Sequence, residues 1–223
     1  MEKNLLLVGG AGYIGSVLAN YFLKNKKISK IYIIDKLLYK YQNFDDKLST
    51  NKKIIFLKKD FSDTNLQNEI LPKVSFVVML AGLVGDPITK KYPKISRIVN
   101  TDRIKKFIIN SNQYNNIERF IFISTCSNYG VIKDKIANEK SKLNPKSSYA
   151  KAKINIEKFL LRSPKIKNVT TILRFATAFG LSPRMRFDLT LNQFCKEALF
   201  NKFIEIYDSM TWRPYCHVLD FSR

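Results

Sequence analysis

A tyrosine and a lysine that stand four residues apart, Tyr149 and Lys153, could together supply a base. Residues at this spacing are neighbours on one face of a helix, so the lysine ammonium can lie beside the tyrosine hydroxyl. A positive charge there stabilises the phenolate and lowers the pKa of the phenol, which is ordinarily about 10. The same spacing occurs by chance on many solvated helices, so the pair indicates chemistry only together with a second motif.

That second motif is the glycine-rich segment Gly-Gly-Ala-Gly-Tyr-Ile-Gly at residues 9–15, directly after an apolar run. Glycines let backbone approach a pyrophosphate, and the start of the following helix faces the phosphates. Asp35 stands 20 residues after Gly15, where a carboxylate would bind a ribose 2′-hydroxyl and repel a 2′-phosphate. A tight turn without a ligand is the alternative. The two motifs together predict redox chemistry with NAD, bound by Gly9, Gly12, Tyr13, Ile14, Gly15 and Asp35.

Apolar runs rich in strand-forming residues alternate with helical patterns, which favours parallel strands joined by helices. The predicted strands are residues 5–8, 31–34, 54–57, 74–80, 120–124 and 169–175, and their continuous apolar character predicts burial on both faces. The predicted helices are residues 13–26, 64–71, 95–113 and 148–162. After Gly180 we expect loops, a helix over 188–200 and a short strand over 203–207. The prediction is an α/β fold: a Rossmann-type doubly wound parallel sheet over residues 1–180 and a small C-terminal substrate lobe over 181–223.

The net charge of +21 at first suggests a nucleic-acid partner. The lysines, however, occur as scattered pairs such as Lys58-Lys59 and Lys105-Lys106, without a stripe that alternates with aromatic residues. We therefore expect a solvated basic surface, no nucleic-acid partner, and some attraction for anionic nucleotides.

The chain has no apolar run long enough to cross a bilayer. Its first apolar run is too short, and too soon interrupted by glycine, to be a signal-peptide core. The three cysteines, Cys126, Cys195 and Cys216, lack metal-ligand spacing. We expect a cytoplasmic protein without a membrane partner, with reduced thiols and no metal site.

Further motifs occur in order along the chain: Asp60-Phe61 after the third predicted strand, Leu80-Ala81-Gly82 after the fourth, Val99-Asn100 in a helix, and Ser124 to Gly130 at the end of the fifth. With the glycine spacing, they make the whole chain resemble the extended short-chain dehydrogenase/reductases, in particular NAD-dependent nucleotide-sugar epimerases and dehydratases. The resemblance implies further cofactor contacts from Asp60, Phe61, Leu80, Ala81, Gly82, Asn100, Tyr149 and Lys153.

The resemblance also implies a mechanism. Tyr149 as phenolate would remove a proton from a sugar hydroxyl, at C4, while hydride passes to the nicotinamide. Lys153 would lower the pKa of the tyrosine and position the ribose, and Thr125 would hydrogen-bond the reacting oxygen. From the residues alone, Thr125 could instead be a β-branched residue that ends a strand.

Departures from the family pattern narrow the reaction. Cys126 and Ser127 follow Thr125 where the 4,6-dehydratases have an Asp-Glu acid/base pair, so dehydration is disfavoured. Thr177 stands where many 4-epimerases place a substrate-contacting Asn. Three interpretations stay open: a nucleotide-sugar epimerase, which we favour, a dehydrogenase or reductase of a similar sugar, and a truncated, catalytically weak dinucleotide-binding protein.

The segments at residues 182–188 and 211–218 resemble those that hold the nucleotide-sugar diphosphate in this family. Arginine suits this task because its planar fork donates two hydrogen bonds to a phosphate. Arg213 is the first candidate, and the other substrate candidates are Thr177, Arg184, Arg186 and Asn192; for the last three a structural role is an equal alternative. We expect His217, the single histidine, to be a packing residue.

The chain stops at Arg223, where family members normally continue with further helices and strands. We therefore expect an incomplete substrate lobe, in a fragment or in a short gene product. Many members dimerise through two long helices, here residues 95–113 and 148–162, so the resemblance also implies a homodimer.

Overall fold

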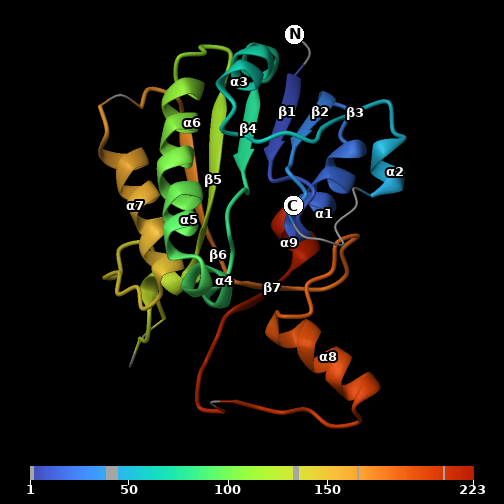
Figure 1. Ribbon diagram of the computed structural model, residues 1–223, viewed down its shortest axis with the longest axis vertical. Coiled ribbons are helices and arrows are strands. Elements are labelled where there is room, and N and C mark those ends of the chain that lie inside the picture. The colour runs from blue at the N-terminus through green and yellow to red at the C-terminus, as the bar shows by residue number, and fades with distance from the viewer. Residues whose placement is uncertain (1–2, 39–44, 133–135, 165, 208) are drawn as a thin grey trace.

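The computed structural model describes residues 3–38, 45–132, 136–164, 166–207 and 209–223. Within these residues, six parallel strands form one sheet in the order β3-β2-β1-β4-β5-β6 (Figure 1). The strands are β1 Lys3–Val8, β2 Ile28–Ile34, β3 Ile54–Leu57, β4 Phe76–Met79, β5 Arg119–Thr125 and β6 Thr170–Phe175. The strand order changes direction between β1 and β4, which leaves a crevice at their carboxyl ends. The prediction of a doubly wound parallel sheet is confirmed.

Helices lie on both sides of this sheet (Figure 1). One side carries α3 Thr64–Ile70, α5 Pro93–Arg97, α6 Ile104–Ser111 and α7 Ser148–Arg162. The other side carries α1 Tyr13–Leu23, α2 Asp46–Ser49 and α9 Val218–Ser222. Shorter elements are α4 Asp86–Lys91, the 3-10 turns η1 Leu71–Lys73 and η3 Cys126–Tyr129, and the π-helical turn η2 Ile98–Arg103. The described part of the chain contains no helix of the length and apolar character that a membrane span requires.

Side chains alternate between the two faces along each strand, as a pleated strand requires. Phe120 and Phe122 of β5 point toward α6 and α7, where they join Phe107 in the larger apolar core. Ile123 points to the opposite face, where a second core forms under α1 around Leu7. Parallel strands with helices on both faces need apolar residues at successive positions, which is why these runs read as continuously apolar.

The second face is covered only in part. An open apolar groove of about 1050 Å³ runs between α1 and the strands β4 to β6. Ile121, Leu173 and Phe175 line it from the sheet, and Phe221 lines it from α9. The prediction that every strand is buried on both faces is wrong for β6, which has no fully buried residue. This strand lies at the edge of the sheet, and its side chain at Leu173 is 36% exposed.

The residues after β6 form a smaller unit. β7 Thr177–Phe179 pairs in parallel with β8 Tyr215–His217, and α8 Thr190–Phe200 lies between them in the sequence. In Figure 1, α8 and the loop after it extend away from the sheet. The chain then returns to the sheet, where Phe221 of α9 stacks on Phe175 with ring centroids 4.0 Å apart. The domain boundary predicted after residue 180 falls directly after β7.

The sequence predictions for two segments need correction. The strand predicted over residues 203–207 is wrong: these residues form no strand, and β7 pairs with β8 instead. Apolar and polar residues alternate here, but no strand lies beside this segment in the described part of the chain, and Phe203 and Ile206 are each 64% exposed. The helix predicted over 95–113 consists of α5, η2 and α6 in succession, whereas the helix predicted over 148–162 is α7 with the same bounds.

Candidate cofactor site and active site

The glycine-rich turn joins β1 to α1 at the carboxyl end of the sheet. Gly9 has a φ of +81°, and a Cβ there would lie 2.7 Å from the backbone of Ala81 in the loop after β4. At Gly15, a Cβ would lie 2.6 Å from the backbone of Gly10. Both positions therefore need glycine for close packing.

Gly12 lies in a different environment within the same turn. A Cβ at this position would meet only the Gly9 carbonyl oxygen, at 3.2 Å. Gly12 is also the N-cap of α1, and no side chain caps this helix start. Unpaired N–H groups at a helix start, next to backbone without a side chain, suit a phosphate.

Asp35 follows β2 and lies beside this turn. Its carboxylate accepts hydrogen bonds from the backbone N–H of Ala11 at 3.2 Å and of Leu37 at 2.9 Å. Burial raises the pKa of Asp35, while these two hydrogen bonds and the charge of Arg184 act in the opposite direction. The fold therefore brings a predicted cofactor residue, Asp35, near a predicted substrate residue, Arg184.

Asp60 follows β3, also at the carboxyl end of the sheet. One carboxylate oxygen accepts hydrogen bonds from Ser62, and the other accepts from Lys36 at 3.0 Å and Arg103 at 2.9 Å. Burial alone would raise the pKa of Asp60, but the bonds from Ser62 and Lys36, with the charge of Arg103, lower it to about 2. The neighbouring Phe61 is buried in the core.

The loop after β4 is held by Asn100 from η2. The Asn100 side chain accepts a hydrogen bond from the Leu83 N–H at 2.7 Å and donates one to the Leu83 carbonyl at 2.9 Å. A Cβ at Gly82 would lie 2.9 Å from the Asn100 side-chain oxygen. Leu80 is tied to β1 through its N–H, which donates to Val8. A π-turn inside a helix is frequent at functional sites, and here it carries the residue that shapes this loop.

Tyr149 and Lys153 lie in the first two turns of α7, which begins with Ser147 as its N-cap. The Lys153 ammonium donates to the carbonyl of Ile123 at 2.6 Å and lies 5.7 Å from the centre of the Tyr149 ring. Lys153 is only 4% exposed, whereas Tyr149 is partly exposed. Burial lowers the pKa of Lys153 to about 8, against the charge of Glu157, which raises it. The spacing thus brings the phenol and the ammonium together as expected.

Thr125 ends β5 and begins the η3 turn. Its hydroxyl accepts a hydrogen bond from the Ser127 N–H at 3.2 Å. In the next residue, Cys126, burial raises the pKa of the thiol, while the charge of Arg213 lowers it. Arg213 stands two residues before β8 in the sequence. Because its charge acts on Cys126, the fold brings this substrate candidate near the turn that follows Thr125.

The other substrate candidates interact mainly with the chain itself. Asn192 is buried, and its side chain donates to the hydroxyl of Tyr13 at 3.1 Å and accepts from the N–H of Gly180 at 3.0 Å. The Tyr13 hydroxyl donates to the Gly180 carbonyl. Arg186 forms an ion pair with Asp188. These contacts tie the residues after β7 to the glycine-rich turn.

Thr177 and His217 lie in the small sheet. Thr177 begins β7, and its N–H donates to the Pro214 carbonyl at 3.0 Å. The ring of His217 packs edge-on against Phe179, and its Nδ1 accepts from the Leu219 N–H at the start of α9. His217 thus contacts Phe179 and caps the start of α9. In the described part of the chain, no group of three or more His, Cys, Asp and Glu could hold a metal.

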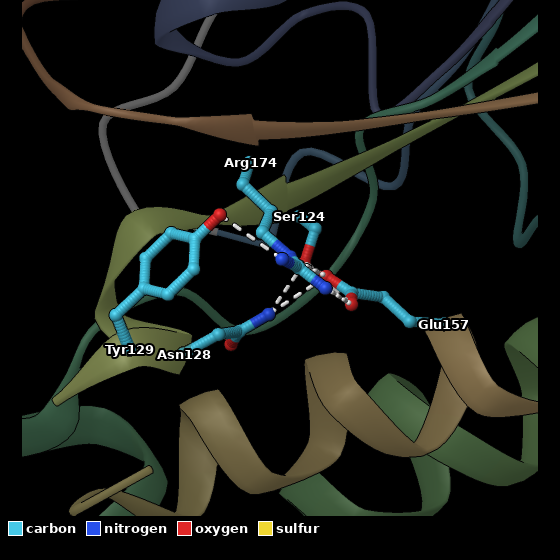
Figure 2. A network of polar contacts seen from close by, with 5 residues as sticks. All are labelled: Ser124, Asn128, Tyr129, Glu157 and Arg174. Atoms are coloured by element: carbon cyan, nitrogen blue, oxygen red, sulfur yellow. Dashed lines mark hydrogen bonds and ion pairs between the residues drawn. The ribbon is translucent and has the colours of Figure 1, made fainter. Parts of the chain in front are cut away.

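The sequence reasoning missed a polar cluster on the α7 side of the sheet (Figure 2). It consists of Ser124, Asn128, Tyr129, Glu157 and Arg174. Two signals could have indicated it: Glu157 stands four residues after Lys153, and Arg174 interrupts the apolar run of β6.

The chain is similar to known proteins in its sequence. A sequence model described as the NAD dependent epimerase/dehydratase family matches residues 5–223. An uncharacterized UDP-glucose epimerase, YtcB of Bacillus subtilis, is 27% identical over 97% of this chain and 69% of its own length. The dTDP-D-glucose 4,6-dehydratase of Dictyostelium discoideum is 27% identical over 70% of this chain and 39% of its own length. The chain therefore spans only part of these relatives.

A solved structure shows the same similarity in three dimensions. The UDP-glucuronic acid 4-epimerase from Bacillus cereus, in complex with UDP-glucuronic acid and NAD, superimposes with a TM-score of 0.85 at 25% identity. The superposition covers 98% of this chain and 70% of the epimerase.

Proposed function

Because the chain belongs to the NAD-dependent epimerase/dehydratase family, we propose that it is an NAD-dependent nucleotide-sugar epimerase that acts on a sugar hydroxyl at C4. The observation that carries this proposal is the buried ammonium of Lys153 beside the partly exposed ring of Tyr149. Two of the similar proteins, from Bacillus subtilis and Bacillus cereus, carry names of UDP-sugar epimerases.

The glycine-rich turn supports NAD as the cofactor. Gly12 and the uncapped start of α1 would hold the pyrophosphate, and Asp35 would hold a ribose hydroxyl and repel a 2′-phosphate. Asp60 and Phe61 are proposed for the adenine side, and residues 80–82 with Asn100 for the edge of the site near β4. Bound NAD would accept the hydride that leaves the sugar carbon.

The residues of this chain would remove the proton from the sugar hydroxyl. Tyr149 would take the proton of the sugar hydroxyl, because the charge of Lys153 favours the phenolate. Thr125, whose oxygen accepts a hydrogen bond from the Ser127 N–H, would donate its own proton to the reacting sugar oxygen. A base and a donor would then act on the same oxygen.

We propose epimerisation rather than dehydration because Cys126 and Ser127 provide no carboxylic acid pair after Thr125. Burial raises the pKa of Cys126, so this thiol stays protonated and does not replace an acid/base pair. A dehydrogenase or reductase of a similar sugar is the second candidate, and it would release NADH or consume it instead of returning the hydride.

For the substrate, we propose that residues 1–180 bind the cofactor and that residues 181–223 contribute to the nucleotide-sugar lobe. Arg213 is the first candidate for the diphosphate, because it is exposed and its charge acts on Cys126 next to Thr125. Arg184 is the second, because it stands in the segment 182–188, which resembles a diphosphate-holding segment of the family. Thr177, Arg186 and Asn192 would act mainly by shaping the lobe, given their contacts within the chain.

We also propose a homodimer through the helices at residues 93–111 and α7. Support comes from exposed apolar side chains on these helices, since Ile95 is 53% and Leu161 is 72% exposed. Sedimentation velocity tests this: the parent should sediment as a dimer and Ile95→Asp as a monomer, whereas a monomeric parent would contradict it.

The function is tested by incubating the protein with NAD and a panel of UDP-sugars and following their anomeric proton signals by NMR. We expect a 4-epimer to form without net NADH. Tyr149→Phe should lower the rate by about 10²–10⁴-fold, since it removes the base. Tyr21→Phe, a change on the partly exposed α1 surface, is the matched control and should keep the parent rate. Accumulation of NADH would favour the dehydrogenase, and an unchanged rate in Tyr149→Phe would contradict the mechanism.

A further inference from the structure

The carboxylate of Glu157 is buried and accepts hydrogen bonds from three other residues (Figure 2). Ser124 donates at 2.5 Å and Asn128 at 2.7 Å to one oxygen, and Arg174 donates to the other at 2.6 Å through Nη2. The Nε of Arg174 adds contacts of 3.1 and 3.2 Å to the two oxygens. Glu157 itself is 2% exposed. A buried carboxylate is stable only when it is paired and hydrogen-bonded in this way.

These donors come from the elements that form the active site. Ser124 precedes Thr125 in β5 and lies opposite Arg174 of β6 in the sheet register. Asn128 belongs to the η3 turn, which begins after Thr125. Glu157 belongs to α7, the helix that carries Tyr149 and Lys153. A single carboxylate therefore connects the strand and turn of Thr125 with the helix of the proposed base.

The cluster extends beyond Glu157 to the end of the turn. Arg174 donates through Nη1 to the Tyr129 hydroxyl at 3.0 Å, and its guanidinium lies 5.1 Å from the centre of the Tyr129 ring. Among the buried side-chain polar atoms of the described residues, the oxygen of Asn128 is the one that lacks a hydrogen-bond partner. Such an atom costs about 1–3 kcal/mol. The Asn128 side chain thus leaves its oxygen unpaired, while its amide nitrogen donates hydrogen bonds to Ser124 and Glu157.

The charge of Glu157 also acts on Lys153, one helical turn away. Burial removes water from the Lys153 ammonium and lowers its pKa to about 8, and Glu157 is the charge that raises it. A lysine that loses its proton can no longer stabilise a phenolate. The negative charge of Glu157 therefore favours the protonation state that the proposed base requires.

Other titratable groups near this part of α7 are Tyr149 on the same helix, Cys126 and Tyr129 on η3, and Arg174 on β6, which Glu157 neutralises. The described charged side chains on the remaining elements packed against α7 are exposed or have partners other than Glu157. Arg103 of η2 pairs with Asp60, Lys105 of α6 lies over the Phe159 ring, and Arg119 of β5 bonds to Thr171. The exposed ones are Lys90, Lys91, Lys94, Arg97, Asp102 and Lys106.

We propose that Glu157 is a positioning residue of the active site: its carboxylate fixes Thr125 relative to the Tyr149–Lys153 pair and holds Lys153 in its charged form. This inference rests on the proposed function, which assigns the three other residues their roles. A purely structural ion pair would affect the stability of the fold but neither the protonation of Lys153 nor the rate per folded molecule.

The test follows the lysine side chains by NMR in protein labelled with ¹³C at the lysine ε-carbon. The signal that is lost in Lys153→Arg belongs to Lys153, and it should titrate with a midpoint near pH 8 in the parent. In Glu157→Gln, which keeps the size and removes the charge, the midpoint should fall by about one pH unit. In Glu157→Asp, which keeps the charge and shortens the side chain, the midpoint should stay close to that of the parent. An equal midpoint in parent and Glu157→Gln would overturn the electrostatic role.

If Glu157→Gln does not fold, the double variant Glu157→Gln with Arg174→Met replaces it, because removing a buried ion pair as a whole is milder than leaving one charge unpaired. The same fall in midpoint is expected there, and its absence overturns the proposal in the same way.

A second readout tests the geometric role. Glu157→Asp should lower kcat at least tenfold with the KM of the UDP-sugar unchanged, whereas an unchanged kcat would overturn this part. The NMR titration needs neither sugar nor turnover. If the epimerase assignment fails, no sugar reacts, yet the midpoints still show whether Glu157 controls Lys153.

Discussion

The two faces of the sheet differ in what the chain places over them. On the face of α6 and α7, Phe107, Phe120 and Phe122 are buried in a continuous core, and the Glu157 cluster joins α7 to β5 and β6. On the face of α1, the strands β4 to β6 line an open apolar groove. The helix that carries Tyr149 and Lys153 thus stands on the closed face. The proposed catalytic geometry therefore depends on packing that the described residues complete among themselves.

The two faces should differ most in how much a side chain of β5 contributes to the free energy of unfolding, because consecutive side chains of this strand point to opposite faces. Phe120→Ala removes a 2% exposed ring from the closed face, and we expect a loss of about 3–5 kcal/mol in the free energy of unfolding. Urea denaturation followed by circular dichroism measures it. A loss below about 1 kcal/mol would mean that the closed face is not tightly packed.

The burial of Lys153 on the closed face should also make the free energy of unfolding depend on pH. Its pKa is about 8 in the folded chain, against 10.5 for an ordinary lysine. Between these two pH values the unfolded chain binds a proton that the folded chain has lost, so stability rises with pH. We expect a rise of at most about 3 kcal/mol that is absent in Lys153→Met. Denaturation of both proteins at pH 7.5 to 10.5 checks it, and parallel pH curves for the two would contradict the burial of this charge.

The smallest effect is expected on the open face. Ile121 follows Phe120 but lines the groove, and it is only partly buried. Because solvent reaches this side chain, Ile121→Ala should cost about 1 kcal/mol, well below the value for a fully buried isoleucine. The same denaturation assay measures this change. A cost equal to that of Phe120→Ala would show that the groove is covered in solution.

The sequence predicted those features that depend on local patterns. Apolar runs gave the positions of the six strands along the chain, and the Ser147 cap and Pro164 bracket α7 at the predicted bounds. The glycine spacing predicted the turn after β1, because close backbone approach needs glycine at Gly9 and Gly15. In each case the prediction needs only residues that are close together in the sequence.

The features that were missed depend on residues far apart in the chain. Glu157 and Arg174 meet only after β6 is placed beside β5, so the local position of each residue does not reveal that the two form a pair. The pairing of β7 with β8 joins two three-residue segments across the whole of α8. The alternation at residues 203–207 satisfies a strand pattern locally, but no neighbouring strand exists for it among the described residues.

The central claim, that the hydrogen at C4 leaves the sugar as hydride and returns to it, is tested most directly with deuterium. UDP-glucose and UDP-glucuronic acid that carry deuterium at C4 are incubated with the protein and NAD in ordinary water, and the products are analysed by NMR and mass spectrometry. The account predicts a 4-epimer that retains its deuterium at C4. An epimer in which solvent hydrogen has replaced the deuterium would contradict it.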